Sequence, residues 1–143
     1  MSDLRPTDSG YESRVRESFA RQRVMQLIGA RLSRVEPGAV SIALAFREDL
    51  AQQDGYVHAG IVTTIADSAC GYAAYTLMPA GSGVLSVEFK VNLLRPAAGE
   101  EFLAEARVIK AGRTLTVTTC DVQARAAGES RLVATMLATM IRR

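Results

Sequence analysis

The sequence has few of the residues on which several common kinds of site depend. Its 143 residues include one histidine, His58, and two cysteines, Cys70 and Cys120. A single histidine excludes a metal site built from several histidines, and these two cysteines fit neither a disulfide framework nor a zinc site. No Ser-His-Asp arrangement, phosphate-binding glycine loop or zinc-ligand spacing occurs. We therefore expect no metal, no bound cofactor and a reducing compartment.

Strong net charge and long apolar runs are also missing. Lysine and arginine number 17 against 15 aspartates and glutamates, and a net charge of +2 gives no electrostatic case for a nucleic-acid partner. No stretch reaches the roughly 18 apolar residues of a membrane span, and residues 1–10 lack the apolar segment of a signal peptide. We expect a cytoplasmic protein with no membrane contact, long enough to bury one core.

The most informative segment runs from Gln52 to Ser86. Between Ala59 and Leu77 the apolar residues recur at helical spacing without a proline, which predicts a buried helix. Proline and glycine in residues 78–81 end it. Its one carboxylate, Asp67, lies among apolar neighbours, where an ionised group is costly unless it has a function or a hydrogen bond. Asp67 is therefore the first catalytic candidate, with a structural hydrogen bond as the alternative.

The other segments predict an α+β fold. The segment 84–94 alternates strictly, with Leu85 and Phe89 on one side and Ser86 on the other, as expected of a half-buried strand. Short turns that contain glycine join the later strands, which is typical of antiparallel neighbours. The predicted elements are a helix at 11–28, strands at 30–35 and 39–46, the buried helix at 59–77, and strands at 84–94, 101–110, 114–125 and 131–141.

This order allows one antiparallel sheet to wrap the apolar helix. We assign residues 1–29 to an N-terminal lead and amphipathic helix, and residues 30–143 to a single domain. Long alternating strands leave sheet edges and faces that one helix cannot cover, so we expect pairing with a second copy of the chain.

The spacing of polar residues around the helix resembles that of a known enzyme family. The residues concerned are Gln52, His58-Ala59-Gly60, Asp67 and Leu85-Ser86-Val87, together with Arg95-Pro96 at the end of the next strand. Their spacing resembles that of the hotdog-fold acyl-CoA thioesterases, specifically the phenylacetate-degradation (PaaI-like) subfamily. The likeness covers residues 40–142. The subfamily signature is His-Gly-Gly with an acidic residue seven positions after the second glycine, so here an alanine replaces the first glycine.

The resemblance implies hydrolysis of an acyl-CoA to a free acid and coenzyme A. The backbone N–H of Ala59, together with Gly60, would hold the thioester carbonyl oxygen, because a helix N-terminus favours a developing negative charge. Asp67 would attack the carbonyl as a nucleophile or activate a water as general base. The implied acyl group is an aryl-acetyl or medium-chain group. The alternative is a non-catalytic module that binds or senses acyl-CoA.

Three polar residues have supporting roles by the same resemblance. Gln52 would hydrogen-bond the carbonyl or the attacking water, His58 would orient the loop and helix start, and Ser86 would position water near the carboxylate. A structural role for His58, a solvated loop position for Gln52 and a water-facing strand position for Ser86 are the alternatives.

Four further residues are candidates for substrate binding. Arg95, Lys110 and Arg113 would meet the phosphates of coenzyme A, although charged residues in turns are usually solvated. Tyr56 would line an acyl pocket, with packing as the alternative.

Asp67 lies eight residues beyond Ala59, or about 12 Å along a helix at 1.5 Å per residue. One carbonyl group cannot touch both, so a shared site requires Asp67 from another subunit, as in similar enzymes. The resemblance accordingly implies a homodimer, often paired again into a tetramer, with its active sites between subunits.

Overall fold

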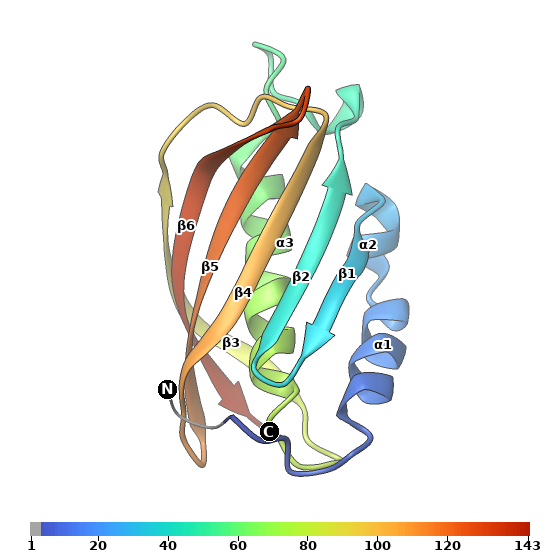
Figure 1. Ribbon diagram of the computed structural model, residues 1–143, viewed down its shortest axis with the longest axis vertical. Helices are drawn as coiled ribbons and strands as arrows, with labels where there is room; N and C mark the ends of the chain where they lie inside the picture. Colours follow the sequence, from blue (N-terminus) through green and yellow to red (C-terminus); the bar gives the residue numbers. More distant parts are fainter. Residues whose placement is uncertain (1–3) are drawn as a thin grey trace.

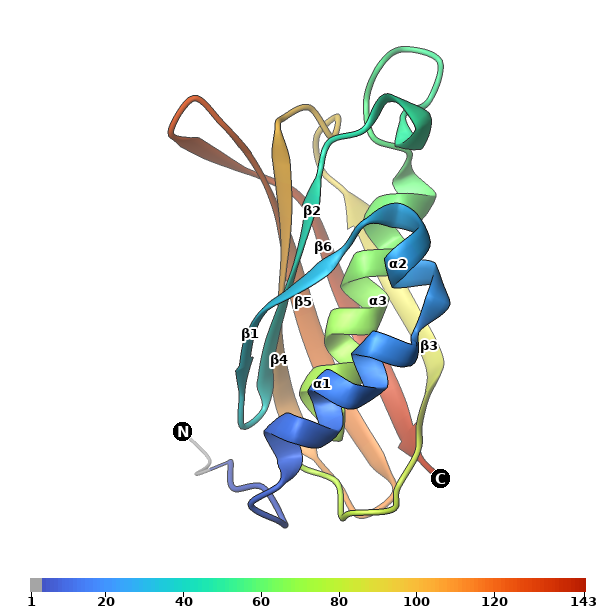
Figure 2. The ribbon, with the colours of Figure 1, turned by 90° about the vertical axis from the view of Figure 1, so that its right-hand side faces the viewer.

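The computed structural model describes residues 4–143 as one antiparallel sheet with helices on one face (Figure 1). The sheet has six strands in the order β1-β2-β4-β5-β6-β3. Figure 2 shows the longest helix, α3, lying between the sheet and the N-terminal helices. The elements are α1 (Tyr11–Arg21), α2 (Arg23–Ile28), β1 (Arg31–Glu36), β2 (Ala39–Ala45), a 3-10 turn (Glu48–Leu50), α3 (Ala59–Tyr75), β3 (Val84–Leu93), β4 (Glu101–Ala111), β5 (Leu115–Ala126) and β6 (Glu129–Arg142).

The core lies between α3 and the inner face of the sheet. Ile65 and Ala69 of α3 are fully buried, as are Ile42 of β2 and Phe102 of β4. Burial of such side chains is the main force that holds a helix on a sheet, at about 25 cal/mol for each Å² of apolar surface removed from water. The predicted α+β plan of a sheet wrapped around an apolar helix is confirmed. Within residues 4–143, no helix combines the length and the hydropathy of a membrane span.

The N-terminal helix is divided, which the sequence does not predict. The expected helix 11–28 ends at Arg21 and restarts at Arg23, because Gln22 has an extended conformation with φ −79° and ψ 96°. Gln22 Nε2 donates a hydrogen bond of 3.1 Å to Ser68 Oγ of α3. The break lets α1 bury Val15 and α2 bury Met25 in the same core. Tertiary packing therefore overrides the local preference for a continuous helix.

β3 differs from its prediction as a half-buried, strictly alternating strand. It is an edge strand, and the side chains of Leu85, Val87 and Leu93 are half exposed. A β-bulge at Val87 shifts the register, so that Ser86 pairs with Met140 while Phe89 pairs with Ala138. Since paired residues share a face of the sheet, Ser86 faces α3 together with Phe89, and Leu85 faces outward. The bulge therefore places the Ser86 hydroxyl beside α3.

Two predicted hairpins are confirmed at the end of the chain. β4 pairs with β5 and β5 with β6, both antiparallel. In the last turn Ala127 and Gly128 have φ of 51° and 77°. Positive φ at both central residues is the conformation that matches the twist of a two-residue hairpin. These hairpins fix the register of the sheet under α3.

Candidate active site

The N-terminus of α3 is held in place by its own cap residue. His58 precedes the helix, and its Nδ1 accepts a hydrogen bond of 2.8 Å from the Gly60 N–H. The backbone on either side is also fixed, because the His58 N–H donates to the Leu50 carbonyl and the Val57 N–H donates to the Ala97 carbonyl. His58 therefore caps the helix through Nδ1, which accepts this hydrogen bond.

Ala59 presents the one unused N–H at this corner. The Gly60 N–H is engaged by His58, and the Ile61 and Val62 N–H groups donate to the His58 carbonyl. In the described part of the chain the Ala59 N–H has no acceptor. A free N–H at the first position of a helix is a donor for an anion or a polarised carbonyl oxygen. Of the two predicted donors, Ala59 is the one that remains available.

A cavity of about 620 Å³ opens beside this N–H, and we call it the helix-start cavity. Apolar side chains of Val62, Leu93 and Val133 form much of its wall. It brings together five of the residues singled out in the sequence. These are Gln52, Tyr56, His58, Ala59 and Arg95.

Gln52 is a structured part of this cavity. Its Oε1 accepts hydrogen bonds from the N–H groups of Asp54, at 2.5 Å, and Tyr56, at 3.4 Å. The carboxamide N–H₂ has no acceptor among residues 4–143, so it is available to donate. Arg95 is held at the mouth by a hydrogen bond of 2.8 Å from its Nη1 to the Leu132 carbonyl. The cavity thus offers donors but no carboxylate.

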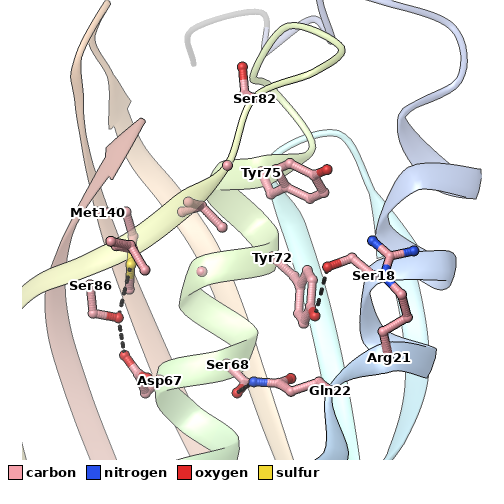
Figure 3. A pocket seen from close by; sticks show the side chains of 14 residues that line it. Ser18, Arg21, Gln22, Asp67, Ser68, Tyr72, Tyr75, Ser82, Ser86 and Met140 are labelled. Atoms are coloured by element: carbon pink, nitrogen blue, oxygen red, sulfur yellow. Dashed lines mark hydrogen bonds between the residues drawn. The ribbon is translucent and has the colours of Figure 1, made fainter. Parts of the chain in front are cut away.

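Asp67 lies in a different cavity, of about 450 Å³, which we call the Asp67 cavity (Figure 3). Asp67 Oδ1 accepts a hydrogen bond of 2.6 Å from Ser86 Oγ, and Ser86 also lies 3.4 Å from Met140 Sδ. Asp67 is partly exposed rather than enclosed in the core, because its side of α3 faces the edge strand β3. Its second carboxylate oxygen has no hydrogen bond within residues 4–143.

The Asp67 cavity also has a wall from α1, which the sequence does not predict. Its lining includes Ser18 and Arg21 of α1, together with Ser68 and Tyr72 of α3. Tyr72 and Ser18 share a hydrogen bond of 3.2 Å. Burial raises the pKa of the Tyr72 phenol above its ordinary value, so its hydroxyl stays protonated at neutral pH.

A four-residue spacing connects Asp67, Gly71 and Tyr75, which all line the cavity. Residues four apart share one side of a helix. This four-residue spacing is the feature of the sequence from which the α3 side of the cavity could have been predicted.

The two cavities have no residue in common. Ala59 lies in the helix-start cavity, whereas Asp67 and Ser86 lie in the Asp67 cavity. A single copy of the chain therefore does not bring the free N–H and the carboxylate to one point.

Two of the predicted substrate-binding residues lie elsewhere. Lys110 and Arg113 are in the β4–β5 hairpin, at the end of the sheet away from the start of α3. Arg113 lines a small cavity of about 170 Å³ beyond the other end of α3, together with Arg142. Within one copy they do not join the helix-start cavity, so a role at coenzyme A phosphates stays a prediction. Among residues 4–143 no cluster of side chains suited to a metal ion occurs.

Comparison with known proteins places the chain in a family. The family model of the Thioesterase superfamily matches residues 54–129. The chain belongs to the thioesterase superfamily. This thioesterase is 53% identical to a thioesterase family protein from Silicibacter pomeroyi, with a TM-score of 0.92 over 93% of this chain and 98% of that one. The predicted hotdog fold, the predicted family and the assignment as a thioester hydrolase are confirmed.

Two further relatives agree with this assignment. Acyl-coenzyme A thioesterase 13 of Homo sapiens is 30% identical over 94 residues, which cover 65% of this thioesterase and 66% of the human protein. The PaaI protein from the phenylacetic acid degradation operon of E. coli shares the fold, with a TM-score of 0.83 over 93% of each chain at 17% identity.

Proposed function

We propose that this thioesterase hydrolyses an acyl-CoA to a free acid and coenzyme A, at a site assembled from two copies of the chain. The observation that carries the proposal is the separation of the unused Ala59 N–H from the Asp67 carboxylate, in cavities without a common residue. The name of the human relative supports the choice of acyl-CoA. The exposed apolar side chains of the edge strand β3 support pairing of two copies.

The first half of the proposed site is the helix-start cavity of one copy. The thioester carbonyl oxygen accepts a hydrogen bond from the Ala59 N–H, and the Gln52 carboxamide donates a second one. Both donors stabilise the negative charge that develops on this oxygen. His58 acts as a positioning residue, because its cap fixes the backbone on which the Ala59 N–H is carried. Arg95 binds the coenzyme A side of the substrate at the mouth, and Tyr56 lines the cavity that holds the thioester.

The second half is Asp67 with Ser86 from the other copy. Ser86 holds one oxygen of the carboxylate, and the second oxygen is free to act. As general base it takes a proton from water while the water oxygen bonds to the carbonyl carbon. As nucleophile it bonds to that carbon itself, and water later cleaves the resulting anhydride. In either route the C–S bond breaks and the coenzyme A sulfur leaves and takes up a proton.

The test is free-thiol release from a panel of acyl-CoA thioesters with short, medium, long and aryl-acetyl groups. The parent should hydrolyse at least one member, and Asp67→Asn should lower that rate at least about a hundredfold, the lower range for removing a general base. Asp121→Asn, at an exposed position on β5, is the matched control and should keep the parental rate. Light scattering should give the same mass for all three proteins.

Two results of this experiment would contradict the proposal. If no member of the panel releases thiol while the parent still binds acyl-CoA, the chain is a non-catalytic acyl-CoA module. If the mass falls to that of one chain on dilution with activity intact, the proposal of a shared site is wrong.

A further inference from the structure

The Asp67 cavity carries one negative and one positive side chain. Its charged lining residues are Asp67 on α3 and Arg21 on α1. Figure 3 shows Asp67 and Ser86 on one side of the cavity and Arg21 on the other, with Ser68 and Tyr72 between them. A ligand that reaches across from Asp67 therefore meets a cation.

Arg21 differs from the other arginines of its helix. Arg14 pairs with Asp8 at 2.8 Å, and Arg16 pairs with Glu12 at 2.9 Å. Arg21 has no carboxylate partner within the described residues, and it lies on the cavity instead. Its positive charge acts on the Tyr72 hydroxyl, where it opposes the larger effect of burial on the pKa of that phenol. The guanidinium is thus available to an anion from outside the chain.

The walls between the two charges combine apolar and polar surfaces. Met140 provides apolar surface on the strand side, while Ser18 and Tyr72 provide hydroxyl groups on the helix side. A short chain of methylene groups matches the apolar wall, and a terminal anion matches Arg21.

We propose that the Asp67 cavity binds the acyl group of the substrate and that Arg21, on the side of the cavity opposite Asp67, binds a carboxylate at the end of that group. On this basis, which rests on the proposed function, the preferred substrates are coenzyme A monothioesters of dicarboxylic acids. A plain alkyl tail would cover the guanidinium and hydroxyl groups without replacing their hydrogen bonds to water, which is unfavourable. A terminal carboxylate replaces those bonds with charge-assisted ones. Arg21 is therefore a specificity-determining residue for the acyl group.

The test compares two acyl-CoA substrates of equal length that differ at the far end, adipyl-CoA and hexanoyl-CoA. The parent should have the higher kcat/KM for adipyl-CoA. Arg21→Gln should lower the ratio of the two kcat/KM values about tenfold, the low end for loss of a charge-assisted hydrogen bond, because Arg21 is partly in water. Arg23→Gln is the matched control, since Arg23 lies on another surface beside Val24 and Leu27, and it should keep the parental ratio.

Binding measured separately distinguishes failure of this inference from failure of the proposed hydrolysis. Both substrates are titrated calorimetrically into Asp67→Asn with and without Arg21→Gln. Tighter binding of adipyl-CoA that depends on Arg21 supports the cavity assignment, even if no thiol is released. If hexanoyl-CoA is hydrolysed or bound at least as well and Arg21→Gln leaves the ratio unchanged, the assignment of Arg21 is wrong while hydrolysis of acyl-CoA stands.

Discussion

Ser86 Oγ donates a hydrogen bond of 2.6 Å to Asp67 Oδ1, which joins the edge strand β3 to the middle of α3. The contact depends on the bulge at Val87, because a regular strand with the register that follows the bulge would turn Ser86 to the outer face. One backbone irregularity thus determines how the candidate catalytic carboxylate is held.

Replacing Ser86 with alanine should lower kcat about tenfold, the low end of the range for a hydrogen bond to a charged group. The carboxylate would lose the donor that fixes its orientation, while the backbone of β3 would stay in place. Steady-state kinetics on the best acyl-CoA of the panel measures the effect. Ser130→Ala, at an exposed position on β6, is the matched control. An unchanged kcat in Ser86→Ala would show that the hydrogen bond has no part in the reaction.

Replacing Ala59 with proline should remove the proposed carbonyl donor and little else. Ala59 is the first residue of α3, a position that accepts proline well, and ψ of 137° at His58 suits a residue that precedes proline. We expect kcat to fall about a hundredfold or more, as for loss of one oxyanion donor. Thermal unfolding should show a melting temperature near that of the parent. A folded Ala59→Pro protein with full activity would place the donor elsewhere.

Two glycines of α3 should respond in opposite ways to alanine. A Cβ on Gly60 would lie 3.0 Å from His58 Nδ1, whereas a Cβ on Gly71 meets nothing within 4 Å. Gly71→Ala should raise the free energy of unfolding by about 0.5–1 kcal/mol, because alanine favours the helix. Gly60→Ala should disturb the His58 cap and lower the free energy of unfolding by about 1 kcal/mol. Denaturant unfolding of both variants checks the signs, and equal shifts would mean that the cap contributes nothing.

Mixing two inactive variants should restore activity if each site takes residues from two copies. Asp67→Asn keeps the Ala59 donor, and Ala59→Pro keeps the carboxylate, so a mixed pair contains one complete site. Random pairing after co-refolding should give about a quarter of the parental rate, since about half of the pairs are mixed and each has one site of two. Thiol release from the mixture is compared with that of the separate variants. A mixture no more active than its components would mean that both groups act within one copy.

Much of the fold follows from local pattern in the sequence. The helix predicted from Ala59 to Leu77 is observed from Ala59 to Tyr75, and the strands agree with their predictions to within a few residues. These elements have one apolar face each, so periodicity alone identifies them. The joints between β4, β5 and β6 contain glycine where the backbone turns, which makes the hairpins equally visible.

The remaining features depend on contacts between distant residues. The break at Gln22 accompanies a hydrogen bond to Ser68, and neither proline nor glycine marks it in the sequence. The bulge at Val87 leaves the pattern of residue types unchanged while it reverses the face of Leu85. His58 Nδ1 accepts the Gly60 N–H, so only Ala59 remains as a donor, and this depends on the geometry of the His58 side chain. Periodicity carries no information on any of these.

The two edges of the sheet are chemically unequal. β1 has six residues, three of them charged, and a bulge between Leu32 and Arg34, features that discourage a neighbouring strand. β3 has ten residues, and four of its apolar side chains are exposed: Leu85, Val87, Phe89 and Leu93. In the proposed pairing along β3, each copy would use its apolar edge strand and turn its charged edge outward. Growth of the sheet would then stop at two chains, so the edge that permits assembly would not propagate into a filament.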